Sequence, residues 1–197
     1  MDGSGLVRVG IILIPKVPSG LMDYEAVSER ILMVRLKGQS DNLTILSLYA
    51  PIRDAPDHLK DKFSADLQLT LNKIPRKDIL VIGCDFNARI GTRLKSSEWA
   101  IRNHGFGDQC ISRVRLLMLS ILNNLSVANT WFQYKSCHTH TWRSRNGLVQ
   151  PQIDYLLVSS RWKSMIEDSR AHRGADTGSK SGSDHFLLKT KVRFRLT

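Results

Sequence analysis

The sequence predicts an α/β domain, and three observations support that prediction. Short apolar runs typical of strands recur along the chain, and residues 55–74 carry the four-residue apolar spacing of an amphipathic helix. Residues 79–82 are continuously apolar, which is typical of a strand buried on both faces. No repeat or linker divides the 197 residues, which are enough for one compact core, so we expect a single domain over residues 1–197.

The first half of the chain predicts a hairpin followed by a helix. Strand-like runs at 30–36 and 43–49 flank a polar turn, so we expect an antiparallel pair with a loop longer than the tightest type. In the helix at 55–74, apolar residues recur at every fourth position, and Asp54 is the expected N-cap.

The second half predicts a helix at 114–123 that leads into a strand at 125–129, and further strands at 153–158 and 186–196. In the last of these, apolar residues alternate with Lys189, Lys191, Arg193 and Arg195. Successive side chains of a strand point to opposite faces, so this pattern predicts one face in the core and one cationic face in water.

The net charge of +11 points to an anionic partner. A field of this sign attracts polyanions, and nucleic acid is the most common large polyanion in a cell. Many proteins that bind no nucleic acid also have a basic surface, so charge by itself does not decide between the two interpretations.

No apolar run is long enough to cross a membrane, and the first residues lack the basic segment of a secretory signal. Cys84, Cys110 and Cys137 are far apart and form no Cys-x-x-Cys pair, which predicts reduced thiols rather than a disulfide framework or a zinc site. We therefore expect an intracellular protein, nuclear or cytoplasmic, with no membrane partner.

Asp85 and Asn87 directly follow the buried strand at 79–82. Residues two apart on an emerging strand point to the same side, so both side chains could face one cleft while Phe86 anchors the loop. A carboxylate beside a carboxamide can orient a water molecule or bind a metal ion. The alternative is an Asx turn that closes the strand.

Two further segments combine acidic residues with histidine. Asp184 and His185 precede the last strand, where an acid can bind a metal and an imidazole can contact a phosphate. Asp154 lies within an apolar run, where a carboxylate needs a partner, and we pair it with His185. The alternatives are an ordinary loop before a strand and an exposed strand face.

Thr141, Trp142 and Arg143 combine a hydroxyl, an indole and a guanidinium, groups that suit phosphate contact and base stacking. We therefore expect them to bind substrate. The alternative is a tryptophan packed in the core with polar neighbours outside.

The order of these motifs resembles the endonuclease/exonuclease/phosphatase superfamily over nearly the whole chain. The matching segments are 48–51 (Leu-Tyr-Ala-Pro), 83–89 (Gly-Cys-Asp-Phe-Asn-Ala-Arg), 152–155 (Gln-Ile-Asp-Tyr) and 182–185 (Gly-Ser-Asp-His). Within the superfamily, the chain is most similar to the endonuclease domains of non-LTR retrotransposons and to craniofacial development protein 2-like sequences.

The resemblance implies a four-layered α/β sandwich of two mostly antiparallel sheets with outer helices, as in deoxyribonuclease-like proteins. It also implies phosphoester hydrolysis with Mg²⁺ or Mn²⁺, acting as a monomer on nucleic acid, DNA above all. By this resemblance, Asp85 would activate the attacking water, and Asn87 would place the water and the phosphate. His185 would contact the scissile phosphate and be held by Asp154. Asp184 would assist at the metal, and Tyr49 would hydrogen-bond a phosphate oxygen.

The chain departs from the family pattern in three places. Family members begin with strands that carry an Asn and a metal-binding Glu, whereas this sequence opens at 5–10 on what resembles the next strand, which predicts a truncated sheet. Cys110 and Arg113 stand where the retrotransposon-type turn usually reads Asn-x-x-Gly, and Cys84 separates the usual Gly-Asp pair.

Three functions stay open on this basis. The first is a retrotransposon-type endonuclease, and the second is an inactive remnant that binds nucleic acid or protein. The third is a sugar- or inositol-phosphate phosphatase, which is less favoured because the sequence shows no compact cationic pocket.

Overall fold

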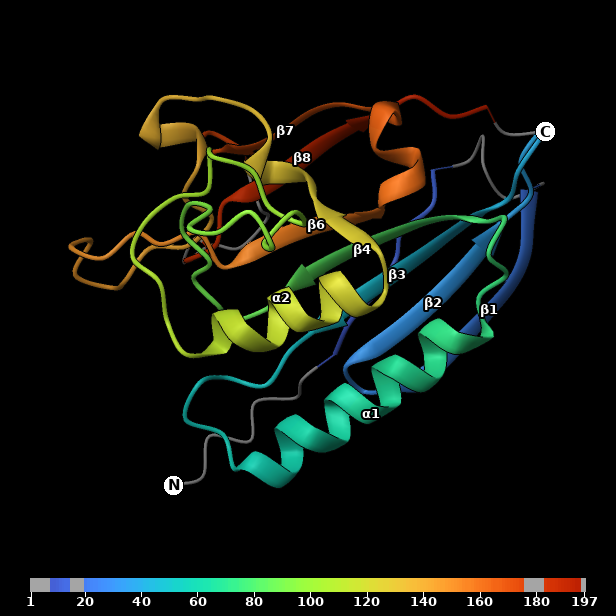
Figure 1. The fold of residues 1–197 in the computed structure, drawn as a ribbon, viewed down its shortest axis with the longest axis horizontal. Helices are drawn as coiled ribbons and strands as arrows, with labels where there is room; N and C mark the ends of the chain where they lie inside the picture. The colour runs from blue at the N-terminus through green and yellow to red at the C-terminus, as the bar shows by residue number, and fades with distance from the viewer. Residues whose placement is uncertain (1–7, 15–19, 176–182, 196–197) are drawn as a thin grey trace. The chain divides into compact units, whose positions relative to one another are not determined.

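The computed structural model describes residues 8–14, 20–175 and 183–195 (Figure 1). The chain divides into two compact units. Unit 1 comprises Met1–Phe86 with Phe194–Thr197, and unit 2 comprises Asn87–Arg193. Residues 5–7, Gly182 and Leu196, which entered the sequence predictions, lie outside the described residues, and residues 8–10 are not in a strand. Within the described ranges, no helix has both the length and the apolar character needed to cross a bilayer.

Unit 1 contains four neighbouring sheet strands: β1 (Leu21–Ser28), β2 (Ile31–Leu36), β3 (Leu43–Tyr49) and β4 (Ile79–Asp85). β2 pairs antiparallel with β3, which confirms the predicted hairpin, and β3 pairs parallel with β4. The predicted buried strand is also confirmed, because all four residues from Ile79 to Ile82 are buried.

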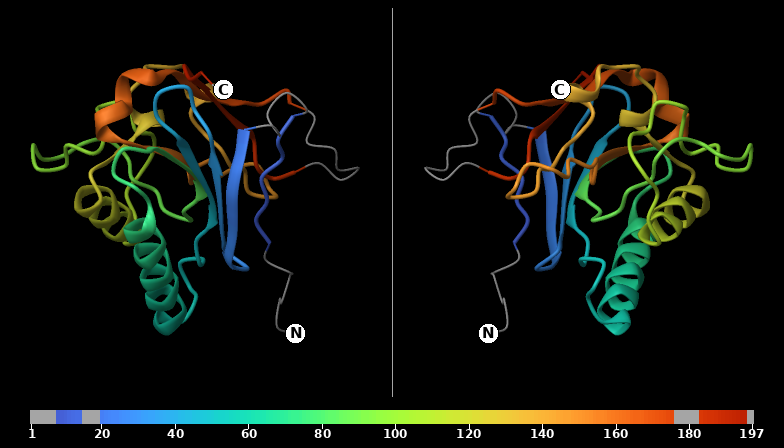
Figure 2. Two further views of the ribbon diagram at one scale, coloured as in Figure 1. Left: turned by 90° about the vertical axis from the view of Figure 1, so that its right-hand side faces the viewer. Right: turned by 90° about the vertical axis from the view of Figure 1, so that its left-hand side faces the viewer.

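Helix α1 (Asp57–Lys73) makes the crossover that two parallel neighbours require, and it covers one face of this sheet (Figure 2). Its buried side chains include Phe63, Leu67 and Leu71, as the spacing predicted. The predicted N-cap is wrong. The helix begins after Pro56, whose fixed φ suits the start of a helix, and no side chain caps it.

Strand β1 was not predicted, and its sequence explains why. Leu21, Met22 and Tyr24 are 44%, 46% and 68% exposed, and acidic residues stand between them, so the strand carries no buried apolar row. Backbone pairing with β2 forms this strand, and backbone pairing leaves no periodic signal in the side chains.

Unit 2 contains α2 (Ser112–Leu122) and two antiparallel strand pairs. β5 (Leu125–Val127) pairs with β6 (Asp154–Ser159), and β7 (Ile166–His172) pairs with β8 (Leu187–Val192). The chain therefore has a mixed α/β fold with a multistranded sheet and a second sheet, as predicted.

The strand predicted at 125–129 ends early, because residues 128–130 form a 3₁₀ turn. Asn129 uses its carboxamide on the backbone of β6: Nδ2 donates to the Asp154 carbonyl at 2.9 Å, and Oδ1 accepts the Leu156 amide at 3.2 Å. These side-chain bonds stand in place of a strand ladder at this point.

Strand β7 was also not predicted, since Ile166 at its start is its one large buried apolar residue and its other buried positions are Ser169 and Ala171. Strand β8 is shorter than predicted, but its exposed Lys189 and Lys191, followed by exposed Arg193 just after the strand, confirm the cationic face. Cys84, Cys110 and Cys137, all within the described residues, form no disulfide, in agreement with the prediction.

Candidate active site

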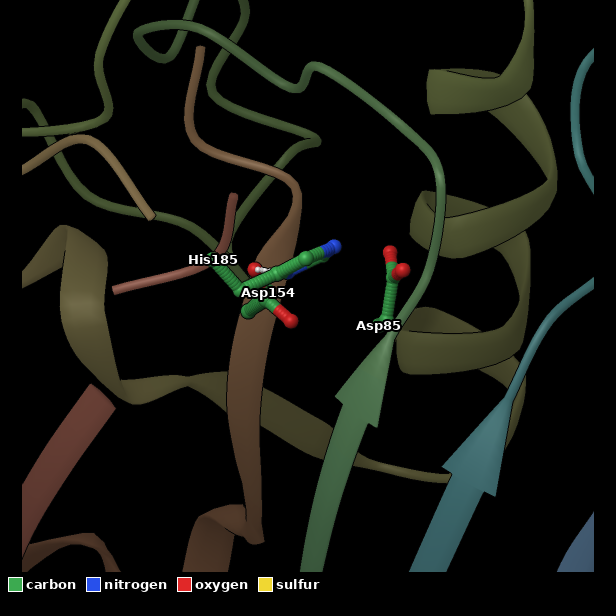
Figure 3. Close-up of side chains that lie close together, drawn as sticks. All are labelled: Asp85, Asp154 and His185. Carbon is green, nitrogen blue, oxygen red and sulfur yellow. Dashed lines mark hydrogen bonds and ion pairs between the residues drawn. The ribbon is translucent and has the colours of Figure 1, made fainter. Parts of the chain in front are cut away.

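Asp154 and His185 meet in unit 2, as predicted. Asp154 is the first residue of β6, and its Oδ2 lies 3.1 Å from Nδ1 of His185 (Figure 3). Both side chains are partly exposed, so a ligand can reach them. A carboxylate at Nδ1 selects the tautomer that carries its proton there, which makes Nε2 the basic nitrogen of the neutral ring.

A short antiparallel pairing places His185 beside the segment 141–143. Phe186 donates its amide to the Thr141 carbonyl at 2.7 Å, and Arg143 donates its amide to the Asp184 carbonyl at 2.8 Å. Trp142 and His185 thereby form an isolated β-bridge. The imidazole is thus oriented from the backbone side as well as by Asp154.

Thr141, which was predicted to bind substrate, hydrogen-bonds to the backbone at the start of β6. Its side chain is fully buried, and its hydroxyl accepts the amides of Ile153 and Asp154, each at 3.0 Å. These two bonds fix the start of β6, where Asp154 lies.

Asp184 and Trp142 contact each other. The indole Nε1 donates to Asp184 Oδ2 at 2.9 Å, and the carboxylate is exposed. Trp142 was predicted to bind substrate. Its N–H is hydrogen-bonded to Asp184, whereas its ring is partly exposed. Asp184 therefore points toward solvent beside His185, where an acid can still take a cation.

Two guanidinium groups lie over the ring of Phe186, the neighbour of His185. Arg143 is 5.9 Å from the ring centroid and Arg173 is 5.3 Å from it. Both are exposed, so this part of unit 2 presents two cations to an approaching anion. No role was predicted for Arg173, although residues 173–176 resemble the retrotransposon-type sequences, because only the fold brings its guanidinium to Phe186.

Asn87 opens unit 2 in the left-handed region, with φ of 49°. Asn adopts this conformation more readily than most residues, and it turns the chain out of β4. Phe86 is buried whereas Asp85 and Asn87 are partly exposed, which is the alternation that the sequence predicted.

Asp85 and Tyr49 are neighbours in unit 1. They end the parallel strands β4 and β3, where they are partners in register, and the Asp85 carbonyl accepts the Ala50 amide at 2.9 Å. The guanidinium of Arg30 lies 5.4 Å from the Tyr49 ring centroid. Figure 3 shows the Asp85 carboxylate at the carboxyl end of β4.

The donor atoms suit a divalent cation. Asp85 in unit 1, and Asp154 and His185 in unit 2, offer the carboxylate oxygens and ring nitrogen that such ions accept.

Comparisons with known proteins agree with the resemblance. No protein-family model matches the chain. The sequence is 33% identical over 188 residues to craniofacial development protein 2 of Bos taurus, and 32% identical to that of Tragulus javanicus, in each case covering 95% of this chain. The chain spans only about a third of the length of these relatives, 31% and 32%.

Solved structures show the fold. The endonuclease domain of TRAS1, a telomere-specific non-LTR retrotransposon, matches 93% of this chain and 72% of its own with a TM-score of 0.63 at 16% identity. A 3′–5′ exonuclease from Neisseria meningitidis matches 85% of this chain and 66% of its own with a TM-score of 0.59 at 17% identity. Together with the relatives above, these matches support the predicted superfamily, and the chain has its fold.

Proposed function

We propose that this chain is a metal-dependent nuclease domain that hydrolyses phosphodiester bonds in nucleic acid, as a retrotransposon-type endonuclease does. The observation that carries the proposal is the Asp154–His185 pair, fixed by Thr141 and by the bridge at Trp142. Two of the similar solved structures bear the names of nucleases, and a third, a 3′ phosphatase from Neisseria, is bound to a product DNA hairpin.

Each side chain has a part in the proposed reaction. Asp85 accepts a proton from the attacking water, whose oxygen forms the new bond to phosphorus, and Asn87 orients that water. His185, held by Asp154, stabilises the negative charge on the phosphate, and Tyr49 donates a hydrogen bond to it. The bond from phosphorus to the leaving oxygen then breaks, and that oxygen takes a proton from solvent.

Mg²⁺ or Mn²⁺ would be held by Asp85, one of the three donors described above, together with Asp184 and Asn87, while Asp154 stays paired with His185. Oxygen atoms are the ligands that these hard cations prefer. When bound, the ion supplies positive charge next to the phosphate oxygens. Exposed Asp184 is already in contact with Trp142, so this residue would link the metal to the substrate-facing indole.

The charge of unit 2 favours nucleic acid as the substrate. Its residues include 17 Lys and Arg against seven Asp and Glu, and exposed members of the basic set stand on β8 and beside His185. A long polyanion can contact many such cations at once, which a small sugar phosphate cannot. We therefore propose DNA as the partner, bound by a monomer.

The test is nicking of supercoiled plasmid with magnesium by the unmutated chain, by Asp85→Ala and by His185→Ala. We expect nicked product from the unmutated chain, a rate lower by about 100-fold or more in each variant, and no product with EDTA. Glu167→Ala is the matched control, since Glu167 is an exposed acid on β7 that is ion-paired with Lys191.

If the unmutated chain cleaves no faster than the two variants, the enzyme proposal is wrong. The inactive-remnant function would then be favoured by retained binding to short oligonucleotides. Preferential release of phosphate from phosphorylated sugars would instead favour the phosphatase.

A further inference from the structure

A buried ion pair between Arg113 and Glu98 contacts the segment that follows Asn87. Arg113, in the first turn of α2, is 7% exposed, and its guanidinium donates from Nη1 to Glu98 Oε1 at 2.8 Å and from Nη2 to Oε2 at 2.9 Å. The same group donates from Nε to the Ile90 carbonyl at 2.6 Å. These two side chains and the bonds they make are called the Arg113–Glu98 clamp.

Glu98 accepts hydrogen bonds from the backbone at the far end of the segment, at Leu94 and Lys95. Its Oε2 accepts the amide of Leu94 at 2.8 Å and that of Lys95 at 3.3 Å. Hydrogen bonding from Arg113, followed by these two amides, lowers the pKa of Glu98 to about 2 against the opposing effect of burial. The carboxylate is therefore ionised throughout the neutral range, and the clamp stays closed.

The clamped segment has no regular structure of its own between Asn87 and Glu98. It packs on the backbone before α2: a Cβ at Gly105 would lie 1.8 Å from the Gly91 carbonyl oxygen, so only glycine fits there. Cys110 adds two bonds to Arg89, accepting its amide at Sγ and donating its own amide to the Arg89 carbonyl, both at 3.1 Å.

Ile90 connects the clamp to the active site. Its carbonyl accepts from Arg113, while its amide donates to the hydroxyl of Tyr155 at 3.2 Å. Tyr155 is fully buried in β6, next to Asp154, and its hydroxyl donates to the Gln152 carbonyl at 2.7 Å. The segment after Asn87 is thus held between α2 and the strand that carries Asp154.

We propose that Arg113 and Glu98 are positioning residues that hold Asn87 in its left-handed turn, in fixed geometry to the Asp154–His185 pair. Neither side chain touches substrate. Both act through Ile90 and the backbone between Asn87 and Lys95. The catalytic consequence rests on the proposed function, whereas the immobilisation of the segment does not.

Unit 1 supplies a matched control. Arg35, which is partly exposed, and buried Asp78 form a second bidentate pair, with Nε to Oδ2 at 2.6 Å and Nη2 to Oδ1 at 3.0 Å. This pair joins β2 to the residue before β4. Arg35→Lys and Arg113→Lys therefore make the same chemical change in two places, and only Arg113 contacts the segment after Asn87.

The experiment compares these two variants by amide hydrogen exchange and by plasmid cleavage with magnesium. In Arg113→Lys we expect exchange at residues 87–95 to rise by about tenfold or more, and kcat to fall by about 10- to 100-fold with a smaller change in KM. In Arg35→Lys we expect a similar loss of thermal stability with neither effect. Glu98→Gln, which keeps the shape of the side chain, replaces Arg113→Lys if that variant does not fold.

Unchanged exchange at residues 87–95 in a folded Arg113→Lys variant overturns the proposal. Raised exchange with a kcat no lower than that of Arg35→Lys also overturns it, because the pair would then be structural. If the unmutated chain cleaves nothing, the proposed function fails, and the exchange comparison still decides whether the clamp immobilises the segment.

Discussion

The two units divide the charge of the chain very unequally. Unit 1 has 12 Lys and Arg against 11 Asp and Glu, for a net +1, whereas unit 2 has 17 against seven, for a net +10 of the total +11. Almost the whole field that attracts a polyanion therefore originates in the unit that also carries the Asp154–His185 pair. The net charge of the whole sequence concealed this separation.

The units also differ in how they are stabilised. Among the described residues of unit 1, the buried polar side chains are Thr44, Thr70 and Asp78, and apolar strands and α1 form the rest of the core. Unit 2 buries ten polar or charged residues, among them Arg113, Asn129 and Thr141, whose side chains hydrogen-bond to the backbone of loops and of β6. Unit 1 is thus mainly an apolar scaffold, whereas unit 2 combines its apolar core with buried side chains that hydrogen-bond to backbone.

The largest effect is expected from Asp154→Asn in unit 2. The carboxamide keeps the size of the side chain but removes the charge that fixes the His185 tautomer, so we expect hydrolysis to slow by about 10²- to 10⁴-fold while the fold persists. The measurement is plasmid nicking at matched protein concentration. Asp78→Asn in unit 1 should instead lower the melting temperature with little change in rate, and equal rate losses in both variants would contradict the division of roles.

The same contrast explains what the sequence could predict of the fold. Periodicity is produced by burial of one apolar face, so β2, β3, α1 and β4 of unit 1 were predicted close to their observed bounds. Strands β1 and β7 were not, because one is exposed and the other buries serine and alanine. The early end of β5 depends on Asn129 bonding to a strand 25 residues later, which no local pattern records.

For the candidate site, motif order predicted the residues better than their contacts. The Asp154–His185 pair was predicted because a carboxylate in an apolar run needs a partner. The burial of Thr141 was not predicted, since its sequence neighbours suggest a surface segment while its hydroxyl bonds to the backbone at the start of β6. Arg113 looked like a departure from a glycine turn, and only the fold shows that it meets Glu98.

An intermediate effect is expected for the pH dependence of the contribution that Glu98 makes to the free energy of unfolding. A folded-state pKa of about 2, against 4.5 ordinarily, means that the unfolded chain binds the proton first as pH falls. The Glu98 carboxylate thus contributes about 3 kcal/mol to the free energy of unfolding. This contribution is fully present above the ordinary pKa and is lost as pH falls through the lowered pKa of Glu98.

Urea unfolding of the unmutated chain and of Glu98→Gln measures this dependence. The difference in unfolding free energy should be constant near neutral pH and should shrink steadily as pH falls below 4.5. Glu25→Gln is the counterpart in unit 1, where Glu25 forms an exposed pair with Lys73 and should contribute about 0.5 kcal/mol or less. A Glu98 difference that does not vary with pH would rule out the ionised clamp.

The smallest effect tests the charge asymmetry itself. Lys189 on β8 and Lys77 before β4 are both exposed, so Lys189→Glu and Lys77→Glu make the same charge change, one in each unit. If nucleic acid lies against unit 2, Lys189→Glu should weaken oligonucleotide binding several-fold, and the slope of log affinity against log salt should become shallower by about 1. Lys77→Glu should leave that slope unchanged. Fluorescence anisotropy with a duplex oligonucleotide over a salt series measures both quantities. Equal changes in the two variants would mean that oligonucleotide binding depends only on the total charge of the chain.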